Sequence, residues 1–105
     1  MIISKTPLRI SFLGGGTDYP AYYRKYGGST LATSINYYTY VTVSKLAPFF
    51  KHKIGVYYAN VERVNNIEEI QHPSVRETLK FMNITEGIEV HIANDLPART
   101  GLGSS

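Results

Sequence analysis

Residues 88–105 read IEVHIANDLPARTGLGSS, and this stretch decides the fold class. Apolar side chains alternate with polar ones from Ile88 to Ile92, which predicts a half-buried strand. The strand runs through Asn94 and Asp95 into the small residues Gly101–Ser105. A glycine-rich loop of this kind usually leads into a helix. We therefore expect a strand followed by this loop, with the helix that would follow it absent from the 105 residues.

The segments before this strand predict more strands and a second helix. Residues 74–83 begin with a capping-box pattern and place Val75, Leu79 and Met82 on one helical face. The Thr, Tyr and Val of residues 30–46 favour a long strand. Residues 53–60 are expected to be its return strand in a hairpin, and residues 61–71 a loop with a short turn.

The N-terminal segment adds a strand and a short helix. Residues 2–13 predict a strand with Pro7 at a sheet edge or a bend, since proline cannot donate to a ladder. Residues 19–26 predict a helix that stops at Gly27 and Gly28, with Asp18 as a plausible N-cap. The whole pattern is that of an α+β domain, a mixed sheet with helices.

Composition narrows the class of protein. One core is expected in 105 residues, of which 43% are hydrophobic and 18% charged. The net charge of +3 admits a polyanionic partner, but the basic residues are scattered singly, which argues against a nucleic-acid surface. The chain has no cysteine, no signal-peptide pattern and no membrane-spanning apolar run, so a cytoplasmic location is expected. The oligomeric state is left open.

Two glycine segments are candidate ligand sites, each with a plainer alternative. The loop from Pro97 to Ser105 suits a phosphate, because small residues let backbone N–H groups approach an anion; a plain turn or terminus is the commoner structure. It lacks the Gly-Lys-Ser/Thr ending of a Walker A loop. Asp18 after Thr17 can accept hydrogen bonds from sugar hydroxyls, or it can merely cap the helix.

Together these segments resemble the GHMP small-molecule kinases, which include galactokinase, homoserine kinase and mevalonate kinase. The first motif is TPLRISFLGGGTDY at residues 6–19, and the second is PARTGLGSS at residues 97–105. Galactokinases carry Glu-His where this chain has Gly15 and Gly16. The triple glycine and residues 67–77 look like the D-glycero-D-manno-heptose 7-phosphate kinase group, with fucose kinases as near relatives.

The resemblance implies roles for particular residues. Gly16, Thr17 and Asp18 would contact sugar hydroxyls, and Arg9 would offset charge on the transferred phosphoryl group; the alternative for Arg9 is a surface salt bridge. ATP would be held by the loop residues Pro97, Gly101, Leu102, Gly103, Ser104 and Ser105. Ser105 would also be the ligand of Mg²⁺. One of Tyr57 or Tyr58 is a candidate for the adenine site.

The implied function is ATP-dependent phosphorylation of a sugar or sugar phosphate hydroxyl, with heptose 7-phosphate as the expected substrate. The implied fold is the N-terminal part of a GHMP kinase, similar to a ribosomal-protein domain, with residues 1–105 as a partial ATP-binding domain and the C-terminal domain absent. The catalytic base is expected beyond residue 105, so the chain alone is expected to be inactive. The alternatives are a fucose-type kinase or a non-catalytic nucleic-acid or interaction domain of the same fold.

Overall fold

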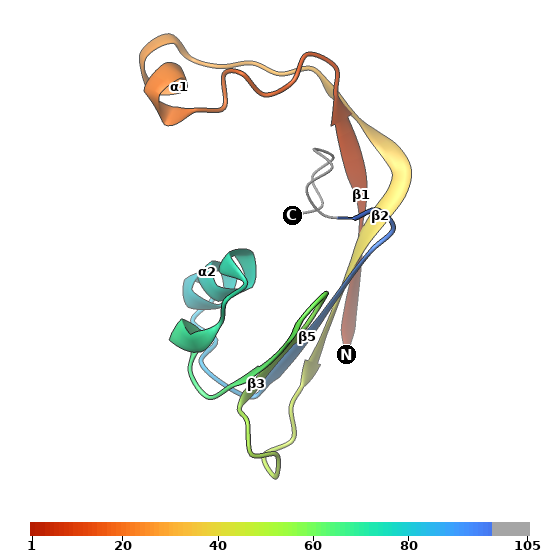
Figure 1. The fold of residues 1–105 in the computed structure, drawn as a ribbon, viewed down its shortest axis with the longest axis vertical. Coiled ribbons are helices and arrows are strands. Elements are labelled where there is room, and N and C mark those ends of the chain that lie inside the picture. Colours follow the sequence, from red (N-terminus) through yellow and green to blue (C-terminus); the bar gives the residue numbers. More distant parts are fainter. Residues whose placement is uncertain (98–105) are drawn as a thin grey trace. The chain divides into compact units, whose positions relative to one another are not determined.

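The structure is a computed structural model that describes residues 1–97 and the contacts among them (Figure 1). Five strands form one mixed sheet in the order β1-β2-β5-β3-β4. The elements, in chain order, are β1 (Ile2–Ser11), α1 (Pro20–Tyr26), β2 (Ala32–Lys45), β3 (Ile54–Tyr57), β4 (Val61–Val64), a 3-10 turn (Ile67–Glu69), α2 (Pro73–Phe81) and β5 (Ile88–Asn94). The α+β class expected from the sequence is confirmed.

The strand pairing corrects two expectations. β3 is parallel to β5 and antiparallel to β4, and β5 lies between β2 and β3. The predicted β2–β3 hairpin is therefore wrong, because a strand about 30 residues further along the chain takes the place beside β2. The predicted loop at residues 61–71 is also wrong in part, since Val61–Val64 is the edge strand β4.

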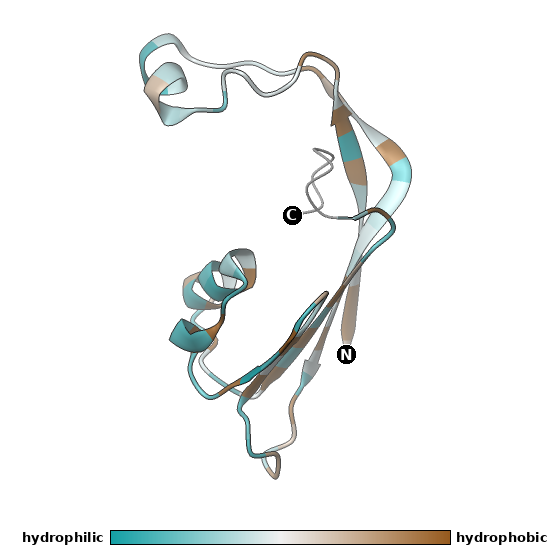
Figure 2. Cartoon of the chain, viewed as in Figure 1, coloured by the Kyte–Doolittle hydropathy of each residue, from teal (hydrophilic) through white to brown (hydrophobic). Residues whose placement is uncertain are grey.

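Residues 1–5 and 40–93 form one compact unit with an apolar core beneath α2. Figure 2 shows the strands beside α2 largely brown, that is apolar, while α2 itself is mostly hydrophilic. The core consists of Ile54, Val56, Ile70, Val75, Leu79, Ile88 and Val90. The predicted inward face of α2 is right for Val75 and Leu79 but wrong for Met82, which follows the last helical residue and is exposed.

The start of α2 differs from the predicted capping box. The N-cap is His72, whose Nδ1 accepts a hydrogen bond from the Val75 N–H at 3.4 Å, so Ser74 lies inside the helix. Glu62 of β4 supports this corner: its carboxylate accepts from Gln71 N at 2.7 Å, from His72 N at 3.3 Å and from the Tyr58 hydroxyl at 2.8 Å. One carboxylate thus ties β4 to the chain entering α2.

Residues 6–39 and 94–97 belong to the second unit. Its first segment is the C-terminal half of β1, in which Leu8 is buried. Pro7 lies in this edge strand, as expected. Just beyond β1, Phe12 N donates a hydrogen bond to the carbonyl of Leu31, just before β2, at 3.0 Å. Between these strands the chain makes a glycine turn and α1, which ends at Gly27 with φ of 74°.

Candidate functional site

The glycine turn after β1 positions the Asp18 carboxylate. Gly14 has φ of 74°, a left-handed conformation that favours glycine, and its carbonyl accepts from the Ser11 hydroxyl at 2.9 Å. Asp18 N donates to Gly15 O at 3.0 Å, which closes a turn over residues 15–18. A Cβ at Gly15 would overlap the Asp18 carboxylate. The lack of a side chain at position 15 therefore leaves room for the Asp18 carboxylate.

Asp18 does not cap α1. The N-cap is Tyr19, and its backbone carbonyl accepts from Tyr22 N and Tyr23 N. No side-chain hydrogen bond caps this helix. The capping alternative for Asp18 is therefore wrong, and its carboxylate is not engaged by the helix terminus.

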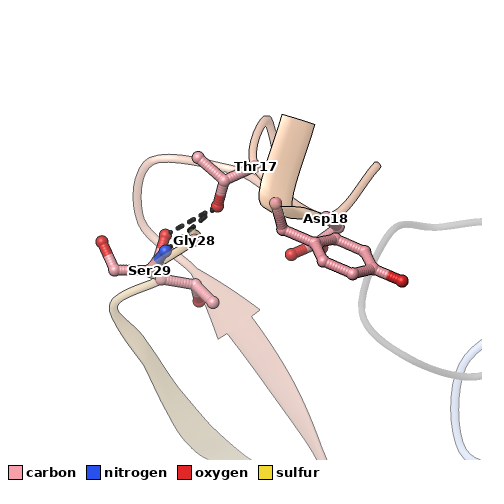
Figure 3. A pocket seen from close by; sticks show the side chains of 6 residues that line it. Thr17, Asp18, Gly28 and Ser29 are labelled. Atoms are coloured by element: carbon pink, nitrogen blue, oxygen red, sulfur yellow. Dashed lines mark hydrogen bonds between the residues drawn. The ribbon is translucent and has the colours of Figure 1, made fainter. Parts of the chain in front are cut away.

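Thr17 holds the turn against the segment that leads into β2. Its Oγ1 donates to Ser29 O at 3.1 Å and accepts from Ser29 N at 3.2 Å (Figure 3). A Cβ at Gly28 would come within 3.1 Å of both oxygens of Thr17. Thr17 uses its hydroxyl for this bridge, so the structure gives it a positioning role beside the expected contact with a sugar.

A hollow of about 460 Å³ lies where these segments meet, a size that fits a small molecule. It is lined by Thr17, Asp18, Tyr23, Gly28, Ser29 and Thr30 (Figure 3). Its polar groups are one carboxylate and several hydroxyls, with one aromatic ring from α1. This set can hydrogen-bond the hydroxyls of a polyol and place a ring against its apolar face.

Three of the lining side chains were not expected from the sequence. Tyr23 is 42% exposed on α1, and Ser29 and Thr30 follow the paired glycines that end the helix. For Ser29 and Thr30, the sequence signal is a pair of hydroxyl residues directly after Gly27 and Gly28, because ligand contacts are common in loops. No such signal marks Tyr23.

The other predicted site residues of this unit lie outside the hollow. A Cβ at Gly16 would meet no atom within 4 Å, and Gly16 is not a lining residue. Arg9 is exposed on β1 and forms no ion pair with the residues that the structure describes, so the salt-bridge alternative gains no support. The expected roles of Arg9 and Gly16 stay predictions.

The approach to the predicted phosphate loop is fixed by side chains. Asp95 Oδ2 accepts from Tyr38 N at 2.7 Å, and Asp95 N donates to Tyr38 O at 2.9 Å. The neighbouring Asn94 Oδ1 accepts from the Thr39 hydroxyl at 2.7 Å. These three bonds hold the end of β5 on β2. Pro97 is described and exposed, whereas the expected ATP and Mg²⁺ residues Gly101–Ser105 lie outside the described residues.

The two tyrosines expected near adenine have different surroundings in the first unit. Tyr58 meets the His72 ring edge-on at 4.7 Å, and burial followed by its hydrogen bond to Glu62 raises the pKa of its hydroxyl. Tyr57 stacks on the His91 ring at 4.5 Å. Neither contact tests the adenine assignment, which stays a prediction.

No helix within residues 1–97 is long and apolar enough to cross a membrane. Within the same range, no three residues of the His, Cys, Asp or Glu type group as metal ligands.

Known proteins provide an independent comparison. No family model matches the chain. A D-glycero-alpha-D-manno-heptose 7-phosphate kinase of Campylobacter jejuni is 26% identical over 116 aligned positions, which cover 99% of this chain and 33% of that enzyme. A crystal structure of a D-glycero-D-manno-heptose 1-phosphate kinase of Bacteroides thetaiotaomicron superposes with a TM-score of 0.72 and 23% identity, over 99% of this chain and 37% of that one. The chain resembles the N-terminal third of a GHMP kinase in both sequence and fold.

A second branch of the family has the same fold. The mevalonate kinase of Methanococcus jannaschii superposes with a TM-score of 0.61 and 19% identity, over 98% of this chain and 35% of that one. The chain thus spans about a third of the length of the GHMP-type kinases that it matches. At such identities a shared structure shows the fold alone, so the roles of particular residues rest on the geometry of this chain.

Proposed function

We propose that this chain supplies the sugar-binding and phosphate-binding segments of an ATP-dependent kinase that phosphorylates a hydroxyl of a sugar or sugar phosphate. The observation that carries the proposal is the Asp18 carboxylate, which is free of helix capping and lines a hollow together with hydroxyl side chains. A carboxylate accepts hydrogen bonds from two adjacent hydroxyls, which suits a polyol.

Each segment has a distinct part in the proposed reaction. Asp18 and the hydroxyls of the hollow orient the sugar, and Arg9 offsets the negative charge that grows on the transferred phosphoryl group. Backbone N–H groups of Gly101–Ser105 would hold the phosphates of ATP, and Ser105 would ligate Mg²⁺, which would supply charge neutralisation there. The hydroxyl oxygen forms the new P–O bond as the bond to ADP breaks, and the hydroxyl proton passes to a base or to water.

The proposed substrate is D-glycero-D-manno-heptose 7-phosphate. Its support is the similarity to the Campylobacter kinase of that name, which extends over 99% of this chain, and the glycines where galactokinases carry Glu-His. A Cβ at Gly15 would displace the Asp18 carboxylate, so glycine at this position leaves the carboxylate in place for a sugar hydroxyl. A fucose-type sugar is the alternative substrate of the same site.

The test is binding and turnover by the full product of the gene, with Asp18→Asn beside the native protein. Heptose 7-phosphate, fucose and galactose are titrated calorimetrically, and ADP formation is assayed for each. We expect binding and turnover of the heptose phosphate, a loss of sugar affinity in Asp18→Asn, and unchanged ATP affinity. Lack of ADP formation with all three sugars would refute the kinase proposal, and unchanged heptose affinity in the variant would remove Asp18 from the site.

A further inference from the structure

A second hollow, in the first unit, has the chemistry of a binding site for a different ligand. It measures about 530 Å³, which falls within the usual range for small-molecule sites. It is lined by Leu46, Phe50, Lys51, His52, Tyr57, Arg63 and Glu89. All of these lie within residues 40–93, so the hollow belongs to one compact unit.

The hollow lies on the side of the sheet that faces away from α2. Ile54 and Val56 of β3 and Ile88 and Val90 of β5 point into the core under α2. Successive side chains of a strand point to opposite faces, so Tyr57 and Glu89 project from the other face. The register pairs Gly55 with Arg63 and with Glu89, which brings those two side chains to either side of a position that has none.

Several contacts position the Tyr57 ring that lines the hollow. Tyr57 stacks on His91 at 4.5 Å with an interplanar angle of 13°. Arg63 Nε donates to the Tyr57 hydroxyl at 3.3 Å, and the guanidinium carbon lies 5.8 Å from the centre of that ring. A Cβ at Gly55 would come within 2.8 Å of the Tyr57 ring, so glycine there permits the ring to lie as it does.

The charges of the hollow favour an anion. Lys51 and Arg63 are cations, and neither forms an ion pair within residues 1–97. Glu89 is the one carboxylate of the lining. It contacts His91 Nε2 at 3.1 Å and also interacts electrostatically with Arg63, so the two cations exceed the carboxylate by one charge. His52 has an Nε2 that is shut off from solvent and has no hydrogen-bond partner among the described residues. An unsatisfied buried nitrogen is costly, and this one belongs to a residue that lines the hollow.

We propose that this hollow binds a small phosphate monoester that carries a planar ring, such as an aryl or nucleoside monophosphate. The phosphate lies between Lys51 and Arg63, where two cations give charge-assisted hydrogen bonds. The planar ring packs against Phe50 and Tyr57, whose faces provide the apolar part of the site. The site lies within the first unit and shares no lining residue with the Asp18 hollow, so it is a candidate for regulation by a nucleotide.

The test is a titration of the ¹⁵N-labelled 105-residue chain, followed by the backbone amide shifts of Lys51, Gly55 and Arg63. The probes are phenyl phosphate, adenosine 5′-monophosphate, inorganic phosphate and adenosine. We expect saturable shifts with the first two, and weaker binding of the ring-free and the uncharged probes. The double variant Lys51→Ala/Arg63→Gln is expected to lower the affinity roughly tenfold, whereas Arg24→Gln/Lys25→Ala, which removes the same charge from α1, is expected to leave it unchanged.

Three results would overturn the proposal. They are the absence of saturable shifts at these amides, equal affinities in the two double variants, and equal affinities for inorganic phosphate and phenyl phosphate. If the first double variant does not fold, Lys51→Ala alone provides the comparison, since Lys51 is exposed in a loop. Because sugar binding and ADP formation are not measured here, failure of this site is distinguishable from failure of the proposed kinase function.

Discussion

Thr17→Val is the sharpest probe of the candidate sugar site, because it removes one hydroxyl and keeps the shape of the side chain. The lost contacts are the two hydrogen bonds between Thr17 Oγ1 and the backbone of Ser29, at 3.1 and 3.2 Å. Ser29 is exposed, so water replaces part of what is lost. A neutral hydrogen bond contributes about 0.5–1.5 kcal/mol net, and the lower half of that range applies to each bond here.

The pair then stabilises the closed turn by about 1–2 kcal/mol, or a factor of roughly 5–30 in its opening equilibrium. The assay is amide hydrogen exchange at Ser29, measured by NMR in the 105-residue chain. We expect Thr17→Val to speed this exchange by that factor, and Thr17→Ser, which keeps the hydroxyl, to leave it close to the native rate. Equal Ser29 exchange rates in Thr17→Val and Thr17→Ser would show that the hydroxyl does not hold the turn, and would refute the positioning role of Thr17.

Three further predictions address other parts of the chain. Gly15→Ala is expected to lower the affinity for heptose phosphate, measured by calorimetry, as much as Asp18→Asn does, because the added Cβ displaces the Asp18 carboxylate. Gly16→Ala is the control, since its Cβ meets no atom within 4 Å. Asp95→Ala is expected to speed hydrogen exchange of the Tyr38 amide several-fold and to weaken ATP binding, and native values of both would refute the anchoring role. Glu62→Gln is expected to lower the free energy of unfolding by about 2 kcal/mol at neutral pH, measured by urea denaturation with Tyr58→Phe as the milder comparison.

The same Glu62 sets a pH dependence. Burial raises the pKa of this carboxyl, but hydrogen bonds from Gln71, Tyr58 and His72 outweigh it and leave the pKa below its ordinary value of 4.5. A lowered pKa in the folded state means that the contribution is fully present above the ordinary pKa and is lost as the pH falls through the lowered one. Glu62→Gln should therefore flatten the acid side of the stability profile, and an unchanged profile would contradict this assignment.

Local patterns allowed most elements to be predicted, but not the way in which the strands pair. The alternation at Ile88–Ile92 and the β-branched residues before Lys45 lie within real strands, because each pattern reports burial along one element. The position of β5 between β2 and β3 depends on contacts between residues far apart in the sequence, such as Ile54 with Ile88 and Tyr38 with Asp95, and no local pattern carries that information. β4 escaped prediction because only four residues pair at the sheet edge, where burial on one face is weak.

Both misplaced helix caps have one cause, and it bears on function. Proline disfavours the helical conformation of the residue before it, and Tyr19 and His72 are extended, with ψ of 131° and 107°. Each helix therefore begins at its proline, and the N-cap is the residue directly before it, not Asp18 two residues before Pro20 or Ser74 after Pro73. In α2 this change moves the cap from a serine to a histidine. In α1 the N-cap is Tyr19, whose side chain makes no capping hydrogen bond. The Asp18 carboxylate therefore does not cap the helix and lines the hollow instead. A carboxylate that binds a sugar has to be available in this way.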